Sequence, residues 1–318
     1  MILVTEDVWG PAFAELAKSN PTTQDPDLWN KKEQLFNSVS QATALVVRNR
    51  TQVTEELILA APQLKIIARA GVGLDNIDVA AADKHGVVVV AGLGANAISV
   101  GELTVGLALS LLRNIPSADH ETKSGKWNRK AGRELAGLTW GLLGCGATGI
   151  ATAQILSGFG VSLVGFDPYV KADDPRVTGL KIWLSSLDDV LNAADIISIH
   201  LPATKETQGL LNAVRLSQMK PGAYIVSVGR GEVIDEADLI IALNSGQISG
   251  AALDVRAAEP PATGELEKLP NVILTPHIAG ITKESQNKIN KILVDNISLV
   301  LNGKSATHAV GAMRESLK

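Results

Sequence analysis

Three polar side chains with complementary chemistry follow short apolar runs in the last third of the chain: Arg230 after AYIVSVG, Glu259 after AALDV and His277 after NVILTP. A guanidinium holds a carboxylate through two parallel hydrogen bonds. An imidazole titrates near neutral pH, so it gives or takes a proton, and a neighbouring carboxylate favours its charged form and fixes its orientation. Together these groups suit the interconversion of a 2-keto acid and a 2-hydroxy acid, in which the carboxylate is held while a proton moves at the oxygen on C2.

Taken singly, each of these residues has an ordinary structural explanation, as a surface arginine, a helix-capping glutamate or a structural histidine. They share one position, however, because each comes just beyond an apolar run that is typical of a strand. The carboxyl ends of parallel strands meet at one edge of a sheet. We therefore predict that Arg230, Glu259 and His277 converge at such an edge as catalytic residues.

A glycine-rich loop, GLLGCGATG, lies between a strand pattern and a helical pattern. Its Gly144, Gly146 and Gly149 have the G-x-G-x-x-G spacing, which permits a tight turn, the close approach of a pyrophosphate and the packing of the helix on its strand. The next predicted strand leads to Asp167, 18 residues after Gly149. A carboxylate there accepts both ribose hydroxyls and repels a 2′-phosphate. A glycine pattern alone arises by chance, but strand, loop, helix and acid together predict a site for NAD rather than NADP.

Short apolar runs alternate with helical stretches along the whole chain, which is typical of α/β domains. The runs are continuous, as expected for parallel strands that are covered on both faces. We predict two α/β units with parallel sheets, divided near residue 95, with the last helix returning to the first unit. The predicted strands are 2–5, 44–47, 65–68, 87–90, 139–144, 162–166, 181–183, 195–200, 223–228, 248–253 and 271–274.

Composition excludes several classes of protein. The 29 Lys and Arg nearly balance the 33 Asp and Glu, and no dense basic stripe marks a nucleic-acid binder. The single cysteine, Cys145, excludes an intramolecular disulfide and a Cys/His zinc cluster, so no metal is expected. The first residues lack the basic segment of a signal peptide, and the apolar stretch 98–112 is too short to span a bilayer. We therefore expect a cytoplasmic protein without a nucleic-acid or membrane partner.

Six segments in combination make the chain similar to a known family. They are ARAGVGLDNID (68–78), NAISVGELTVGLALSLLR (96–113), GLLGCGATGI (141–150), SVGRGEVIDEADL (227–239), AALDVRAAEP (251–260) and TPHIAG (275–280). The chain resembles, over nearly its whole length, the NAD-dependent D-2-hydroxyacid dehydrogenases, particularly their phosphoglycerate dehydrogenase branch. The resemblance implies two Rossmann-like or flavodoxin-like parallel-sheet domains with a cleft between them: a substrate domain at 1–95 plus 285–318 and an NAD-binding domain at 96–284. It also implies NAD as cofactor, a small-molecule 2-hydroxy or 2-keto acid as substrate, a homodimer built largely through the cofactor domain, and catalytic roles for the Arg, Glu and His above.

The resemblance also assigns binding residues position by position. Besides the glycines and Asp167, it implies cofactor contacts at Ala147 and Thr148 for the pyrophosphate, at His200, Leu201, Pro202 and Thr207 near the adenosine, at Val228, Gly229 and Asp254 near the nicotinamide, and at the backbone of Ala279 and Gly280. It implies substrate contacts at Val72 and Gly73, whose N–H groups would hold the carboxylate, and at Asn96, which would flank the same cleft.

Two arginines follow predicted strands of the first domain: Arg48 after ALVV and Arg69 after KIIA. The resemblance places them where phosphoglycerate-directed members carry arginines, and two cations beyond Arg230 suit a substrate with a second anionic group. The alternative is that one or both are solvated arginines, and Arg suits phosphate without being restricted to it. We therefore expect a 3-phosphoglycerate-like substrate, with sulfolactate or another dicarboxylic-type 2-hydroxy acid as the alternative.

Several features depart from the family pattern. Ser227 stands where Asn is common, Thr148 stands where Ile is common, and the segment 126–137 looks short, which leaves open any contact with a partner's site. The chain ends soon after its last predicted helix, so no C-terminal regulatory domain is expected. A non-enzymatic alternative is an NAD-gated binding protein, because C-terminal-binding corepressors resemble the same family. Oxidation of NADH by 2-keto acids would discriminate between the two.

Overall fold

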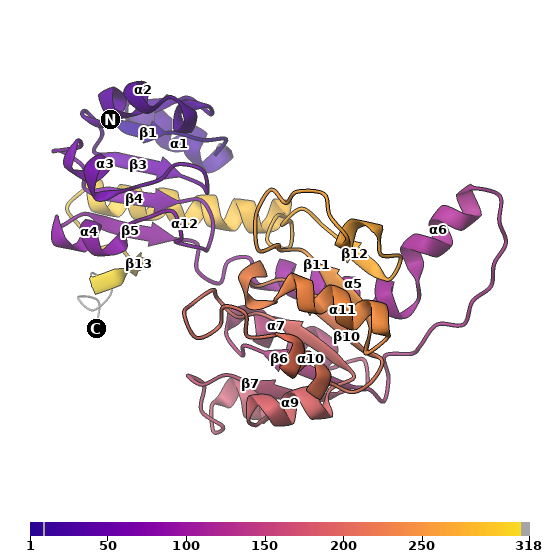
Figure 1. Ribbon diagram of the computed structural model, residues 1–318. Helices are drawn as coiled ribbons and strands as arrows, with labels where there is room; N and C mark the ends of the chain where they lie inside the picture. Colours follow the sequence, from indigo (N-terminus) through magenta and orange to yellow (C-terminus); the bar gives the residue numbers. More distant parts are fainter. Residues whose placement is uncertain (9, 313–318) are drawn as a thin grey trace. The chain divides into compact units, whose positions relative to one another are not determined.

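The computed structural model describes residues 1–8 and 10–312, which fold into two compact units (Figure 1). The first unit consists of Met1–Asn96 and the chain from Ile281 on, and the second of Ala97–Gly280. Each unit has a sheet of largely parallel strands with helices packed on both faces. The predicted fold class, two α/β domains with parallel sheets, is confirmed. The cleft between the domains stays a prediction.

The sheet of the first unit has the strand order β13-β5-β4-β3-β1-β2. All neighbours are parallel except the two-residue β13, which is antiparallel to β5. Neither β13 nor β2 was predicted, because β13 is very short and β2 has the polar sequence TTQ. The strands are β1 (Ile2–Val4), β2 (Thr22–Gln24), β3 (Ala44–Val47), β4 (Ile66–Arg69), β5 (Val88–Ala91) and β13 (Ala309–Val310).

Successive residues of these strands point to opposite faces, so each continuous apolar run contributes to two cores. On one face Leu45 and Ile67 are buried among side chains from α2, α3 and α4, and on the other Val46 and Ala68 are buried among side chains from α1 and α12. The helices are α1 (Pro11–Ser19), α2 (Lys32–Val39), α3 (Glu55–Leu59), α4 (Val79–Lys84) and α12 (Lys283–Leu301), with a 3-10 turn η1 (Leu28–Asn30).

The sheet of the second unit is entirely parallel, in the order β12-β11-β10-β9-β6-β7-β8. The chain builds outward from β6 in both directions, so the carboxyl ends of β6 and β9 form the switch point at which open α/β sheets bind ligands. The predicted strand 181–183 begins only at Trp183, because Lys181 has a left-handed backbone with φ 55°. The strands are β6 (Thr139–Leu143), β7 (Ser162–Phe166), β8 (Trp183–Leu184), β9 (Ile196–Ile199), β10 (Ala223–Ser227), β11 (Ile248–Leu253) and β12 (Val272–Leu274).

Helices cover both faces of this second sheet. Side chains of α5 and α7 form one core with Trp140 and Leu142, whereas α9, α10 and α11 form the other with Ile197 and Ile225. The helices are α5 (Ala97–Leu112), α7 (Ala147–Leu156), α8 (Pro175–Gly179), α9 (Leu187–Ala193), α10 (Ala213–Gln218) and α11 (Glu236–Ser245), with 3-10 turns η2 (Gly231–Val233) and η3 (Leu266–Lys268).

A further helix, α6 (Ile115–Lys123), follows α5 and was not predicted. The left-handed Asn114, with φ 52°, lies between the two helices, and Pro116 is in the first turn of α6. No residue of α6 is buried, and in Figure 1 it extends away from the rest of the second unit. Among the described residues no single helix is long and apolar enough to cross a membrane, although the bent pair α5 and α6 together meets the length and composition required.

A buried carboxylate fixes the loop that follows β3. Glu6, just after β1, accepts hydrogen bonds from four consecutive backbone N–H groups, those of Arg48 (2.8 Å), Asn49 (3.2 Å), Arg50 (3.0 Å) and Thr51 (3.0 Å). Burial raises the pKa of Glu6, but these donors outweigh burial and hold the pKa below its ordinary value of 4.5. The loop that carries Arg48 is therefore built around a negative charge.

Glu6→Gln should lower the free energy of unfolding at pH 7 by about 1–3 kcal/mol, because an amide accepts these hydrogen bonds less well than a carboxylate. The pKa of Glu6 is lower in the folded chain, so its stabilisation is present above the ordinary carboxyl pKa and is lost as pH falls through the folded value. Urea unfolding across the acid range measures this.

The difference between the two proteins should therefore shrink as the solution is acidified. Glu15→Gln, which changes an exposed carboxylate on α1, is the matched control and should have little effect at any pH. A Glu6→Gln difference that stays constant from neutral to acidic pH would contradict the charge-based account.

Candidate active site

The glycine loop leads from the end of β6 into the first turn of α7. Gly144 has a φ of 99°, which residues with side chains rarely adopt, and a Cβ on Gly149 would overlap the Gly144 carbonyl oxygen. A Cβ on Gly146, at the N-terminus of α7, would meet nothing within 4 Å. The first and third glycines are thus required by the protein's own packing, whereas the second borders open space. A pyrophosphate needs such a helix N-terminus, with backbone N–H groups and no side chain in the way.

Asp167, at the end of β7, is held against this loop. Its two carboxylate oxygens accept one backbone N–H each, from Cys145 (2.8 Å) and Tyr169 (2.9 Å). Each oxygen retains a lone pair that a ribose hydroxyl can use. Burial, and then the charge of Asp167, raises the pKa of the Cys145 thiol to about 12, so this cysteine is not a nucleophile at neutral pH.

The segment after β9 packs between the glycine loop and the loop after β10. A Cβ on Gly144 would lie 3.1 Å from the His200 carbonyl carbon, and one on Gly229 would lie 2.6 Å from the Leu201 carbonyl oxygen. The ring Nε2 of His200 lies 3.0 Å from Ser198 Oγ. Burial lowers the pKa of His200 to about 3, so the ring is neutral. These predicted cofactor residues are therefore close together in the second unit.

The other predicted cofactor residues belong to the same edge of the sheet. Ala147 and Thr148 form the first turn of α7, and Val228 is buried directly after β10. Thr207 donates a hydrogen bond of 2.6 Å to the Pro202 carbonyl and thereby closes the turn that follows β9. Their contacts with a cofactor stay predictions.

The imidazole of His277 and the carboxylate of Glu259 form a close pair beyond the ends of β12 and β11. Nδ1 of His277 lies 2.6 Å from Oε2 of Glu259. The hydrogen bond to Glu259 raises the pKa of His277 and exceeds the opposing effect of burial. Burial raises the pKa of Glu259, but the His277 hydrogen bond and its other partners bring the pKa below its ordinary value. Both shifts favour an imidazolium–carboxylate pair, and the side chains are open enough to solvent for a substrate to reach them.

Asp254, at the end of β11, holds the loop that carries His277. Its buried carboxylate accepts hydrogen bonds from Thr275 Oγ1 (2.6 Å) and from the backbone N–H groups of Ile278 (2.9 Å) and Ala279 (2.8 Å). Its carbonyl accepts the N–H of His277 at 2.8 Å. His277 itself has a left-handed backbone with φ 56°, a conformation that needs such support. Asp254 therefore fixes the histidine through the backbone.

Arg230 follows β10 and belongs to the same group of charges. Its positive charge helps to lower the pKa of Glu259 and opposes the rise in the pKa of His277. A Cβ on Gly231 would overlap the backbone of Arg256 and Ala257, so the loop after β10 packs directly on the loop that carries Glu259. The structure thus brings the three predicted catalytic residues together at the carboxyl ends of neighbouring strands. Their catalytic roles stay predictions.

Sequence reasoning missed Arg256, whose side chain binds Glu236 and Glu267 beside the predicted acid–base pair. An arginine three positions before Glu259 was the only local signal. Its partners are 20 and 11 residues away, and no pattern in the sequence connects them.

The predicted substrate residues all lie in the first unit. The guanidinium of Arg69 lies across Gly71, where a Cβ would overlap it, so this cation is beside the loop that contains Val72 and Gly73. Arg48 is half-buried at the end of β3, and among the described residues no carboxylate forms an ion pair with it. The fifth predicted residue, Asn96, ends the first segment of this unit and directly precedes α5.

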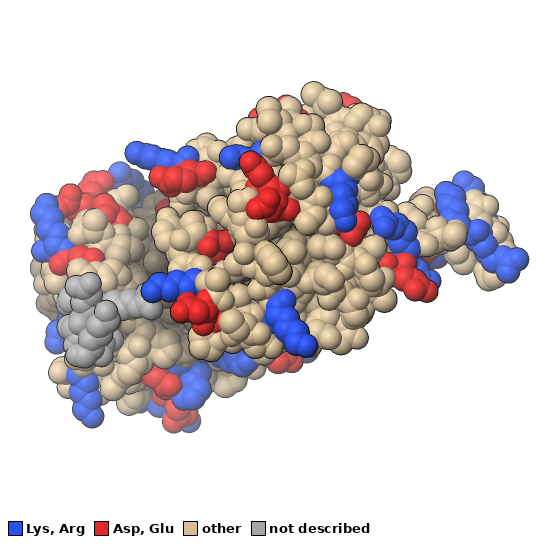
Figure 2. Space-filling model, turned by 90° about the horizontal axis from the view of Figure 1, so that it is seen from below, with Lys and Arg blue, Asp and Glu red and all other residues tan. Residues whose placement is uncertain are grey.

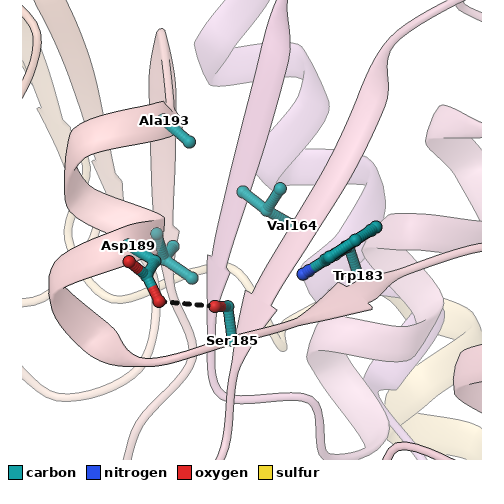
Figure 3. A pocket seen from close by; sticks show the side chains of 6 residues that line it. Val164, Trp183, Ser185, Asp189 and Ala193 are labelled. Atoms are coloured by element: carbon teal, nitrogen blue, oxygen red, sulfur yellow. Dashed lines mark hydrogen bonds between the residues drawn. The ribbon is translucent and has the colours of Figure 1, made fainter.

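A separate hollow occurs at the edge of the second sheet, between α9 and β8 (Figure 3). The Ser185 hydroxyl donates a 2.7 Å hydrogen bond to Asp189 at its rim. None of the residues that line the hollow is a predicted site residue; they are Val164, Trp183, Ser185, Asp189, Val190 and Ala193.

Within residues 1–8 and 10–312, no three His, Cys, Asp or Glu side chains are grouped so that they could hold a metal ion.

A family model and curated relatives show which known proteins this chain is similar to. Residues 105–279 match the family model described as "D-isomer specific 2-hydroxyacid dehydrogenase, NAD binding domain", which confirms the predicted NAD cofactor. The chain is 41% identical over 312 residues to a D-3-phosphoglycerate dehydrogenase of Archaeoglobus fulgidus, and the match covers 97% of this chain and 59% of that protein. The chain spans about half the length of the curated relatives that it matches, for example 59% of this one and 46% of a D-3-phosphoglycerate dehydrogenase of Bacillus subtilis.

Solved structures of other proteins are similar to this chain over nearly its whole length. The TT0316 protein of Thermus thermophilus has a TM-score of 0.89 at 31% identity, covering 98% of this chain and 99% of that one. A D-lactate dehydrogenase of Aquifex aeolicus, complexed with NAD and lactic acid, has a TM-score of 0.82 at 29% identity, covering 95% and 96%.

Glu259→Gln should lower the pKa of His277, because the amide keeps a hydrogen bond but removes the negative charge that favours the imidazolium. In the unchanged protein His277 should stay protonated above the ordinary histidine pKa of 6.5, and in the variant it should lose its proton at lower pH. NMR titration of the histidine ring protons measures both values, and a His277→Ala variant identifies the resonance. Equal pKa values in the two proteins would contradict the pairing.

Proposed function

We propose a reaction for this chain from one premise: it belongs to the D-isomer specific 2-hydroxyacid dehydrogenase family. The proposed reaction transfers a hydride between NAD(H) and C2 of a D-2-hydroxy acid or 2-keto acid. The observation that carries it is the 2.6 Å contact between His277 and Glu259, in the same unit as the glycine loop. A proton donor with a raised pKa, an arginine and a dinucleotide loop at one sheet edge are the parts that this reaction needs.

The pair also fixes which nitrogen of His277 meets the substrate. A carboxylate only accepts hydrogen bonds, so the Nδ1 that faces Glu259 carries a proton and Nε2 is left for the substrate. In the direction of reduction, the imidazolium donates its Nε2 proton to the carbonyl oxygen on C2. In the direction of oxidation, the neutral ring accepts the hydroxyl proton at the same atom. Arg230 holds the substrate carboxylate through its planar fork.

When bound, the cofactor would accept the hydride from C2 as NAD⁺ in the direction of oxidation and would supply it as NADH in the direction of reduction. The open space at Gly146 and the backbone-fixed oxygens of Asp167 support a fit for the pyrophosphate and the adenosine ribose. Asp254 would act near the nicotinamide through the loop that it holds, because its oxygens already accept three hydrogen bonds. The remaining proposed contacts are Gly144, Ala147, Thr148, Gly149, His200, Leu201, Pro202, Thr207, Val228, Gly229, Ala279 and Gly280.

The first domain, 1–95 plus 285–318, is proposed to bind the substrate, and 96–284 to bind NAD. Arg48, Arg69, Val72, Gly73 and Asn96 would contact a substrate that has a second anionic group. The position of Arg69 beside the 71–73 loop, and the absence of a carboxylate partner for Arg48 among the described residues, support this. The phosphoglycerate dehydrogenase relatives make 3-phosphoglycerate the first candidate, and sulfolactate or a similar acid the alternative.

A panel of 2-keto acids tests the proposal, with NADH oxidation followed at 340 nm. The keto acid of 3-phosphoglycerate should react with a higher kcat/KM than hydroxypyruvate, which lacks the distal phosphate. NADH should be preferred to NADPH, because Asp167 repels a 2′-phosphate. Arg48→Ala should raise KM for the phosphorylated substrate more than for hydroxypyruvate.

Tight NADH binding without turnover of any 2-keto acid would contradict the proposed reaction and favour the NAD-gated binding protein instead. Equal use of NADPH would contradict the role of Asp167. If Arg48→Ala affected both substrates equally, the proposal that the substrate has a second anionic group would be wrong, whereas the proposed reaction would stand.

The projecting α6 and the segment after it support a homodimer. This part of the second unit contacts little of its own chain, and Ile115 and Trp127 are exposed on it. Figure 2 shows Lys and Arg side chains on this projection. The sequence of α6 and the segment after it contains Lys123, Lys126 and Lys130. We propose that a second copy covers it in a cytoplasmic dimer, and light scattering that gave the mass of one chain would contradict this.

A further inference from the structure

We propose that Arg256 is a positioning residue of the acid–base pair: its guanidinium, clamped between Glu236 and Glu267, fixes the loop that aims Glu259 at His277. The inference rests on the proposed function, because it concerns the same pair. It adds a residue that touches neither substrate nor cofactor but controls the geometry of the group beside the proton donor.

The clamp uses all three nitrogens of the guanidinium. Nε and Nη2 of Arg256 each donate a hydrogen bond of 2.9 Å to the two oxygens of Glu236, and Nη1 donates one of 2.6 Å to Glu267. The side chain is only 10% exposed. Because the fork is planar and engaged on two sides, it has essentially one orientation, which a lysine would not reproduce.

Backbone groups connect this clamp to Glu259. The Arg256 N–H donates a 3.1 Å hydrogen bond to Oε1 of Glu259, whereas Oε2 faces His277. The next N–H, that of Ala257, donates to Glu236 at 3.0 Å. The two oxygens of Glu259 therefore have separate partners, and the one fixed by Arg256 determines where the other points.

The clamp also fixes this loop against the loop of Arg230. Gly231 packs so closely on the backbone of Arg256 and Ala257 that a Cβ there would overlap it. Glu236 lies in the first turn of α11, which follows the η2 turn after Arg230. Arg256 thus joins the two loops that carry the proposed carboxylate-binding and proton-orienting groups.

Arg256 and the carboxylates that it binds stabilise one another's charged forms. The hydrogen bond from Arg256 is the largest of the effects that hold the pKa of Glu236 below its ordinary value. Its hydrogen bond to Glu267 is likewise the largest of the effects, with backbone donors such as the Gly264 N–H, that together lower the pKa of Glu267 to about 2. Without the cation, two carboxylates would face one another across the loop. They would separate or take up protons, and the backbone between them would lose its support.

The charged groups that face His277 are Glu259, Asp254 and Arg230. Asp254 holds the histidine loop through contacts that do not involve Arg256, whereas the loop of Arg230 packs on the loop of Arg256. A change in the protonation of His277 in such a variant therefore reports on Glu259, on a movement of Arg230, or on the longer-range field of the unpaired Glu236 and Glu267. Loss of the Glu259 contact lowers the pKa of His277, whereas withdrawal of the Arg230 cation and extra negative charge both raise it.

The test compares Arg256→Gln and Arg256→Lys with Arg215→Gln, a half-buried arginine of the same unit that donates to the Leu210 carbonyl. Two quantities are measured: the pH dependence of kcat/KM for 2-keto acid reduction, and the pKa of His277 by NMR. In both Arg256 variants the upper limb of the profile and the pKa should move to lower pH by about one pH unit, a tenfold change in the ratio of protonated to neutral His277 at a given pH. The control should match the unchanged protein.

A double variant makes the test specific. In a Glu259→Gln background, Arg256→Gln should cause no further shift to lower pH, because the group through which it acts is already gone, whereas the field of the unpaired Glu236 and Glu267 acts in the opposite direction. A further shift to lower pH in the double variant, an unchanged pKa in both single variants, or a shift to higher pH in the single variants would each overturn the proposal. If Arg256→Gln does not fold, Arg256→Lys, which keeps the charge but not the fork, decides the question.

The NMR measurement separates this inference from the proposed reaction. If no 2-keto acid is reduced but the pKa of His277 falls in the Arg256 variants, the reaction is wrong and the positioning role stands. If the acids are reduced and the pKa of His277 does not change, the reaction stands and the positioning role is wrong.

Discussion

The 2.6 Å hydrogen bond between His277 and Glu259 forms only if other parts of the second unit hold both side chains in place. The two residues come from separate loops, so each loop needs its own support. Asp254 fixes the histidine loop through three hydrogen bonds to its carboxylate, and Arg256 fixes the glutamate loop through its ion pairs. Neighbouring parallel strands, β11 and β12, place the loops at the same edge.

Carboxylates that accept backbone N–H groups recur where strands end in this protein. Glu6 binds four N–H groups of the loop after β3, Asp167 binds the N–H of Cys145 after β6, and Asp254 binds two N–H groups after β12. Each connects loops whose strands are neighbours in the sheet. A loop held in this way keeps its shape before a ligand arrives, which lowers the conformational entropy lost on binding.

The sequence was sufficient for the parallel α/β architecture, because continuous apolar runs such as ALVV indicate strands covered on both faces. The glycine loop and Asp167 were recognisable because their spacing is local. The supports were not, since Glu236 and Glu267 lie 20 and 11 residues from Arg256 and only the folded chain brings them together. Helix α6 was missed for a related reason: it buries no residue, so it carries no apolar period.

The central claim is that His277 moves the proton at the oxygen on C2. The test is the single-turnover oxidation of bound NADH by a 2-keto acid, measured in the unchanged protein and in His277→Ala. The measurement is made under conditions in which the chemical step limits the rate. The account predicts that the rate falls about 10²–10⁴-fold, the usual contribution of a general acid, while NADH binds with unchanged affinity. A near-normal rate in His277→Ala would contradict it and assign the proton to another group.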